Sequence, residues 1–169
     1  MGSIALFPSG ILVIGILSPV AQPLVQVEND IVSAWGAIAI ESPIIEFSHS
    51  SYYVEEMGSP LFKQWVGIRL PEIHSPTGLV KELTQAIENH YKTDGKRTLN
   101  LDPGLLFPHQ LMLFSTKNYA HRIPIADGIY GELELLYRNG NWDSLPWTYP
   151  DYQLPEIQSF FTQCRNCII

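Results

Sequence analysis

The sequence predicts an α+β fold: a single domain over residues 1–169, with a mostly antiparallel sheet and helices packed on one face. The length is typical of one domain, and no linker, repeat or low-complexity segment divides the chain. Two hairpin-turn dipeptides, Asp127-Gly128 and Asn139-Gly140, join three strand-like segments in the second half. The element order therefore combines an early crossover with a late antiparallel meander.

An uncharged apolar run stands at residues 11–17, between Gly10 and Ser18-Pro19. Seven apolar residues are too few for a membrane helix, which needs about 20, and no basic segment precedes the run as in a signal peptide. The run is typical of a strand buried on both faces, an interpretation that we prefer to a membrane or targeting segment. We therefore expect a soluble, cytoplasmic protein.

The other elements of the first half follow from apolar periodicity and from turn residues. Proline suits the first turn of a helix, and glycine suits its C-terminal end. The expected elements are a helix at 23–35, a strand at 37–47 interrupted by Ser42-Pro43, one helical turn at 51–58, a strand at 61–70 and a helix at 77–91. The last of these helices is expected to place five side chains on one face: Leu79, Leu83, Ala86, Ile87 and His90.

The second half is expected to be mainly strands, ending in a helix. Alternation of Leu133 and Leu135 with Glu132 and Glu134 predicts one buried face in the central strand of the meander. Residues at i, i+3, i+4 and i+7 predict an amphipathic final helix. The expected strands lie at 98–101, 110–115, 122–126, 129–138 and 141–145, and the helix lies at 155–164.

Composition and missing motifs exclude several function classes. The formal net charge is −7, with 10 Lys and Arg against 17 Asp and Glu, which argues against a nucleic-acid partner. The sequence contains no P-loop, G-x-S-x-G, H-E-x-x-H or G-x-G-x-x-G motif, and the five histidines lack metal-ligand spacing. Cys164 and Cys167 have no second cysteine pair, so we interpret them as one packed and one frayed thiol rather than as half of an intermolecular zinc site.

Polar residues gather in the segment 94–104, where strand alternation places Asn100 and Asp102 on the same face. Lys96 and Arg97 stand at the start of this strand, where they can bind an anionic group. An alternative interpretation is purely structural: residues 102–104 form a turn, Asn100 caps a loop, and the two cations are solvated.

Two further segments carry candidate functional groups. Residues 115–122 hold Lys117, His121 and Arg122, and the histidine suits proton transfer near neutral pH, although a lone histidine is more often structural. The segment 145–152 is rich in aromatic residues and proline, and it can form a rigid lid or simply cover the sheet edge before the last helix.

The chain resembles an uncharacterised bacterial and archaeal family of similar length, a domain of unknown function. The resemblance extends over about residues 11–161, which form the family-like core. It is carried by five motifs: Y-Y-x-x-E-M-G from Tyr52, D-G-K-R-x-L-N-L-D-P-G from Asp94, S-T-K-x-Y-x-H-R from Ser115, G-I-Y-x-E from Gly128, and P-W-T-Y-P-D-Y from Pro146. The family has no established activity, cofactor or catalytic residues, so the resemblance implies none for this chain.

The sequence leaves two classes of function open. The first is binding of a small phosphorylated or nucleotide-like ligand, with possible acid–base or phosphate-ester chemistry. The second is a non-enzymatic interaction module that uses the aromatic segment 146–152. We predict no metal, nucleic-acid or membrane partner, and no motif assigns a reaction, a cofactor or an oligomeric state.

For the first class, we expect the polar residues to converge on one concave surface with segment 147–152 closing one side. The catalytic candidates are Asp102, His121 and Glu132. The candidate ligand-binding residues are Lys96, Arg97, Asn100, Lys117, Arg122, Trp147, Tyr149 and Asp151.

Overall fold

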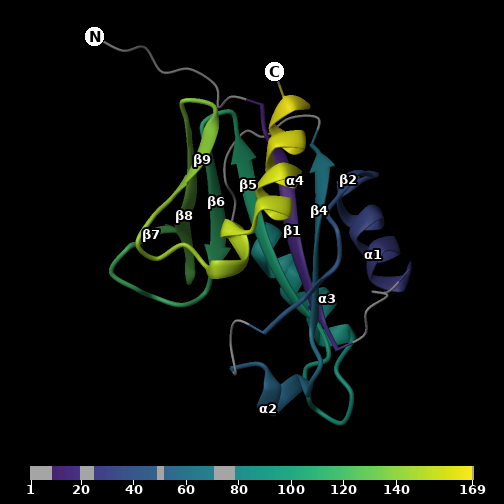
Figure 1. The fold of residues 1–169 in the computed structure, drawn as a ribbon. Coiled ribbons are helices and arrows are strands. Elements are labelled where there is room, and N and C mark those ends of the chain that lie inside the picture. Colours follow the sequence, from purple (N-terminus) through teal and green to yellow (C-terminus); the bar gives the residue numbers. More distant parts are fainter. Residues whose placement is uncertain (1–8, 20–24, 49–51, 71–78, 169) are drawn as a thin grey trace.

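The computed structural model describes residues 9–19, 25–48, 52–70 and 79–168. Nine strands in these ranges form one antiparallel sheet, in the order β2-β4-β1-β5-β6-β8-β7, with β3 paired to β4 and β9 paired to β8 (Figure 1). The strands are β1 Ile11–Ser18, β2 Ile38–Glu41, β3 Ile45–Glu46, β4 Phe62–Arg69, β5 Asn100–Phe107, β6 Gln110–Ser115, β7 Arg122–Ala126, β8 Ile129–Arg138 and β9 Asn141–Ser144.

The helices follow the sequence periodicity closely. They are α1 Val25–Trp35, α2 Val54–Met57, α3 Leu79–His90 and α4 Pro155–Asn166, and the 3-10 turn η1 Pro150–Gln153 precedes α4. The predicted α+β class is therefore confirmed, and so is the late meander of β7, β8 and β9 on its two glycine turns. The residues expected to begin the first and third helices, 23–24 and 77–78, and the start of the helical turn at 51 lie outside the described ranges.

Helices cover both faces of the sheet, whereas the sequence predicts them on one face. Figure 1 shows α4 on the near side of the sheet and α3 on the far side. All eight residues of β1 are buried, and alternate side chains of a strand point to opposite faces. Ile11 and Val13 pack in the cluster that contains α4, while Leu12 and Ile14 pack in the cluster that contains α1. An apolar strand of this kind needs a cover on each side, which makes the one-face prediction wrong.

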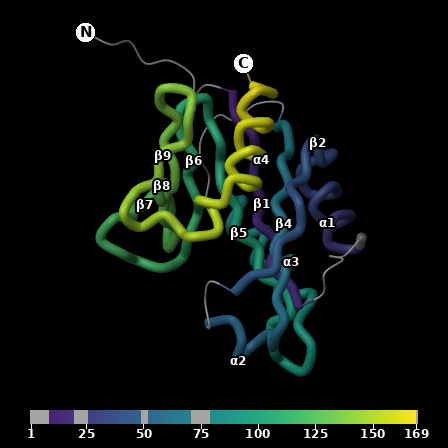
Figure 2. Tube along the Cα trace, in the orientation of Figure 1, coloured from purple at the N-terminus to yellow at the C-terminus, as the bar shows by residue number. Residues whose placement is uncertain are grey.

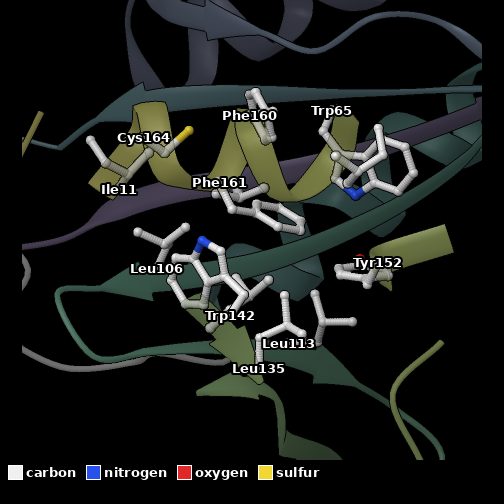
Figure 3. Packing of buried hydrophobic residues seen from close by; sticks show 13 residues of the cluster. Ile11, Trp65, Leu106, Leu113, Leu135, Trp142, Tyr152, Phe160, Phe161 and Cys164 are labelled. Atoms are coloured by element: carbon white, nitrogen blue, oxygen red, sulfur yellow. The ribbon is translucent and has the colours of Figure 1, made fainter. Parts of the chain in front are cut away.

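Aromatic side chains dominate the core beneath α4. Phe161 stacks on Tyr152 with ring centroids 5.6 Å apart, and Tyr152 meets Trp65 edge to face (Figure 3). Cys164 is buried in the same cluster, and burial raises the pKa of its thiol to about 12. The thiol is therefore un-ionised at neutral pH, which suits the packing role expected for it.

Helix α3 packs on the sheet through a mixed face, on which Val80 and Ile87 contact the core beside buried polar residues. Lys81, Thr84 and Glu88 are buried, while 56% of Leu79 is exposed. The reason lies in β5, which pairs with β6 only from Gly104 onward and so leaves the edge of its first residues open. That open edge needs hydrogen-bond partners, and α3 supplies them. The prediction of which residues form the buried face of this helix is therefore wrong.

A bulge in β8 changes the predicted alternation of the meander. The strand β6 pairs first with Leu135 and then with Leu133, so Glu134 is an extra residue in β8. Because the alternation restarts at this point, Glu132 and Leu135 are both buried, and Glu134 is buried as well. The single buried face that the alternation predicts is therefore replaced by a strand whose two glutamates both enter the interior.

Residues 102–104 lie inside β5, so the turn that the structural alternative expects at this position is wrong. Figure 2 shows α2 beside the loop that leads into β5. An ion pair joins the two, with Arg97 Nη2 3.2 Å from Glu56 Oε2. This connection places α2 at the end of the sheet where β5 begins.

Candidate functional site

Polar residues of four strands share the face of the sheet that α4 covers. Asp102 pairs with Gly15, which also pairs with Trp65, a member of the aromatic core under α4. Paired residues of neighbouring strands point to the same face, and so do residues two apart in one strand. Lys63 therefore points the same way as Trp65 and Asp102. Pairing gives the same face to Glu132, which lies opposite Leu113 and Arg122.

The buried ammonium of Lys63 lies at the centre of this face. Its Nζ atom is 2.7 Å from Asp151 Oδ2 and 3.6 Å from Asp102 Oδ2, and the Lys63 side chain is only 6% exposed. The ring centroids of Trp65 and Tyr152 lie 4.8 and 5.3 Å from the same nitrogen. These contacts tie β4 to β5 and to the turn η1.

The charges of this cluster keep Lys63 protonated and Asp102 ionised. Burial alone lowers the pKa of Lys63, but the Asp151 and Asp102 carboxylates outweigh it and raise the pKa above the usual value. Burial likewise raises the pKa of Asp102, but the Lys63 and Lys81 ammonium groups outweigh it and lower the pKa. Lys63 and Asp102 are therefore both charged at neutral pH.

Glu132 forms a second buried ionic cluster. Its Oε2 atom accepts a hydrogen bond from Arg122 Nε at 2.6 Å, and its Oε1 atom lies 2.5 Å from His121 Nε2. Arg122 also donates to Ser115 Oγ at 2.8 Å and to Tyr149 Oη at 3.2 Å. The guanidinium thus connects the end of β6, the strand β8 and the segment before η1.

The His121 ring lies in an aromatic stack at the edge of this cluster. It is parallel to Trp147, with centroids 4.9 Å apart, and to Tyr119, with centroids 6.0 Å apart. A histidine held by a buried carboxylate has a fixed ring orientation and can accept or donate a proton. The ring is part-exposed, so a ligand can reach it.

Three adjoining pockets lie around these clusters. The outer pocket has a volume of about 400 Å³, and the inner pocket has a volume of about 180 Å³. The third, which we call the His121 pocket, has a volume of about 260 Å³. Lys117 and Tyr149 line all three, and Tyr52, Tyr53, Asp102, Phe114 and Ser115 line both the outer and the inner pocket.

The structure brings most of the predicted residues to these pockets. Arg97 and Asn100 line the outer pocket, Glu132 and Asp151 line the inner one, and Asp102 lines both. His121 and Trp147 line the His121 pocket, which Glu132 also lines. Asp102 and His121 therefore occupy different pockets, joined through Lys117 and Tyr149.

Two of the residues predicted to bind the ligand, Lys96 and Arg122, do not line the three pockets. Lys96 is exposed in a turn, where its backbone pairs with that of Thr93, and it lines none of the three pockets. Arg122 lies behind the pocket wall, buried against Glu132. Lys96 is thus outside the site, and Arg122 holds the walls in position.

A family model described as a domain of unknown function, DUF4416, matches residues 8–167. The chain belongs to this family. The match confirms the resemblance stated from the sequence motifs. A search of curated proteins and a search of solved structures each found no match. Within the residues that the structure describes, no helix combines the length and apolar character needed to cross a membrane.

The candidate residues named from the sequence do not include Lys63, which lines the inner pocket, or Glu134, which is buried; Tyr152 is expected there only as part of the covering segment 147–152. A signal for Lys63 was present, because a lysine inside an apolar strand is rarely buried unless an acid pairs with it. Its partners lie 39 and 88 positions away, at Asp102 and Asp151, so local spacing gave no means of finding them.

Glu134 lies beneath the segment that covers the inner pocket. Its Oε2 atom accepts a hydrogen bond from the backbone N–H of Tyr149 at 3.3 Å, and its Oε1 atom has no hydrogen-bond partner among the described residues. Burial and the neighbouring charge of Glu132 raise its pKa to about 8. The Glu134 carboxyl group is therefore largely protonated at neutral pH.

We expect Glu132→Gln to lower the free energy of unfolding by about 3 kcal/mol or more, because the buried Arg122 guanidinium loses its anionic partner. Urea denaturation measures this change. The control is Asp143→Asn, which breaks the exposed Arg138–Asp143 pair and should cost less than about 1 kcal/mol. Equal effects of the two substitutions would show that the Glu132 cluster is not a structural anchor.

We expect Glu134→Gln to remove a pH dependence of stability. The folded state holds a proton on Glu134 up to about pH 8, whereas the unfolded state releases it near the ordinary glutamate pKa of 4.5. Wild-type stability therefore falls between these two values as pH rises, by up to about 1.4 kcal/mol per pH unit from this group. In urea denaturation at pH 5 to 8, the free energy of unfolding of the variant should increase relative to that of the wild type as pH rises.

Glu55→Gln is the matched control for Glu134→Gln, because Glu55 is exposed. Its stability should follow that of the wild type at every pH. If the Glu134→Gln curve also runs parallel to the wild-type curve, Glu134 does not hold a proton in the folded state.

Proposed function

We propose that the joined outer and inner pockets bind a small phosphorylated or nucleotide-like ligand, with its phosphate in the outer pocket. The observation that carries the proposal is the concentration of cations there. Four of the ten Lys and Arg residues of an acidic chain line this one pocket: Lys81, Lys92, Arg97 and Lys117. Lysine and arginine clusters are the usual means of recognising phosphate.

Three of the four cations have different contacts. Lys81 donates to the backbone carbonyl of Leu101, and Arg97 is held by Glu56 and by Asn100 Oδ1. Lys117 is exposed, and its Nζ atom lies 4.4 Å from the centroid of the Tyr52 ring. Such a contact is worth only about 0.5–1 kcal/mol at an exposed site, so a phosphate can replace it.

Aromatic rings in the same pocket support a ligand that has a flat or ring-shaped part. Tyr52, Tyr53 and Tyr149 line both the outer and the inner pocket. Aromatic walls with a few polar groups between them are typical of small-molecule sites. The His121–Glu132 pair adjoins these walls through Lys117 and Tyr149, so His121 is the group placed to exchange a proton with a bound ligand.

The contacts of the aromatic segment 146–152 favour a ligand site over an interaction module. Trp147 donates from Nε1 to the carbonyl of Leu133 at 2.7 Å and stacks on His121. Asp151 and Tyr152 are buried against the sheet. The segment is therefore occupied with its own domain and covers a polar pocket, as a wall of a binding site does.

In a thermal-shift screen of nucleotides and sugar phosphates, we expect at least one compound to raise the melting temperature of the protein, because a ligand that binds only the folded state stabilises it. Lys117→Met should weaken binding of the best ligand about tenfold, through loss of one charged contact. Lys96→Met is the control, because this lysine lies outside the pockets and should bind as the wild type does. Absence of any stabilising ligand, or equal weakening by both variants, would contradict the proposal.

A further inference from the structure

We infer that the non-phosphate part of the ligand is a sugar, and that its hydroxyl groups bind in the inner pocket to Lys63, Asp102 and Tyr152. This inference rests on the proposed function, because it takes the phosphate to lie in the outer pocket. The two pockets share Asp102, Ser115 and Lys117, so one small molecule can extend through both.

Two buried polar groups near Asp102 can form further hydrogen bonds. Tyr152 is 1% exposed and lines the inner pocket, and Asn100 is 4% exposed and lines the outer one. Neither the Tyr152 hydroxyl nor Asn100 Nδ2 makes a hydrogen bond of normal geometry within the described part of the chain, although Trp65 lies beside the first and the Asp102 carboxylate beside the second. Buried polar atoms are bonded in the great majority of cases. Each atom has less than 1 Å² of exposed surface, so a ligand oxygen accepts a hydrogen bond from it after a small shift of the side chains that line the pocket.

The groups around the inner pocket offer donors and acceptors together. The Lys63 ammonium and the Tyr152 phenol donate hydrogen bonds, while the Asp102 carboxylate, which is 31% exposed, accepts them. A hydroxyl group both donates and accepts, so neighbouring hydroxyls on one ring match such a mixed set. A purely apolar group would leave these polar atoms unpaired.

Charge distribution decides which end of the ligand enters the inner pocket. Three carboxylates line it, those of Asp102, Glu132 and Asp151, and Lys63 already pairs with two of them. A phosphate at this position would face like charges, whereas a neutral hydroxyl group would not. Three carboxylates, those of Glu56, Glu88 and Asp102, also line the outer pocket, but four cations line it, against two in the inner pocket, Lys63 and Lys117. The ligand is therefore oriented with its anionic end outward.

Aromatic walls complete the match to a sugar ring. Phe47, Tyr53 and Tyr152 line the inner pocket next to the polar groups. The C–H faces of a sugar ring are apolar, and burial against aromatic rings removes them from water while the hydroxyl edge meets the polar groups. The volume of about 180 Å³ admits only a small group.

The test is isothermal titration calorimetry on the full chain with four probes. D-ribose 5-phosphate, D-glucose 6-phosphate and adenosine 5′-monophosphate carry a phosphate and a sugar, and ethyl phosphate carries the same phosphate without hydroxyl groups. We expect at least one sugar-bearing probe to bind ten times more tightly than ethyl phosphate. Comparison of the nucleotide with the two sugar phosphates shows whether the sugar is recognised alone or as part of a nucleotide.

Tyr152→Phe should remove most of this tenfold advantage and leave the affinity for ethyl phosphate unchanged. Tyr137→Phe, outside the three pockets, is the control and should bind all probes as the wild type does. If ethyl phosphate binds as tightly as every sugar-bearing probe, the inference is overturned while the proposed function stands. If no probe binds, the proposed function itself fails. The comparison of probes uses the wild-type protein, so it holds even if a variant does not fold.

Discussion

The buried charge of Lys63 is the constraint on which the rest of the site depends. An ammonium group removed from water is stable only beside compensating charge, and here Asp151 and Asp102 supply it. One of these partners lies in the turn before α4 and the other in β5, so the pairing fixes the C-terminal segment against the sheet. Gly15 makes room for it, because a Cβ atom there would lie 3.2 Å from Lys63 Cε.

The pockets exist because β5 and β6 pair over only part of their length. Before Gly104 this edge of β5 has no neighbouring strand, and α3 takes its place: Lys81 donates to the Leu101 carbonyl at 3.0 Å, and the Leu101 N–H donates to Glu88 at 2.6 Å. The opening between the two strands is therefore lined by charged side chains rather than by apolar ones. The same lack of pairing that exposes backbone groups also creates the space in which a ligand can bind.

Local signals in the sequence predicted the elements, and long-range contacts decided the site. The glycine turns of the meander, the apolar run of β1 and the periodicity of α4 each depend on residues close together in the chain, and these predictions are confirmed. The buried face of α3 depends on an unpaired strand edge, and the burial of Glu134 depends on a bulge; neither leaves a trace in local periodicity. The polar clusters around Asp102 and Glu132 could be anticipated from residue types, but their separation into joined pockets could not.

A double-mutant cycle on Lys63 and Asp151 tests the central claim most directly, since it isolates the coupling between the two charges. Lys63→Met and Asp151→Asn should each lower the free energy of unfolding by about 3 kcal/mol, because each removes the nearest opposite charge from a buried ion. The double variant should cost at least about 1 kcal/mol less than the two single losses added together, because it leaves neither of these two charges without its partner. Additive losses would show that Lys63 and Asp151 act independently, and would contradict the account of the site as built around this ion pair.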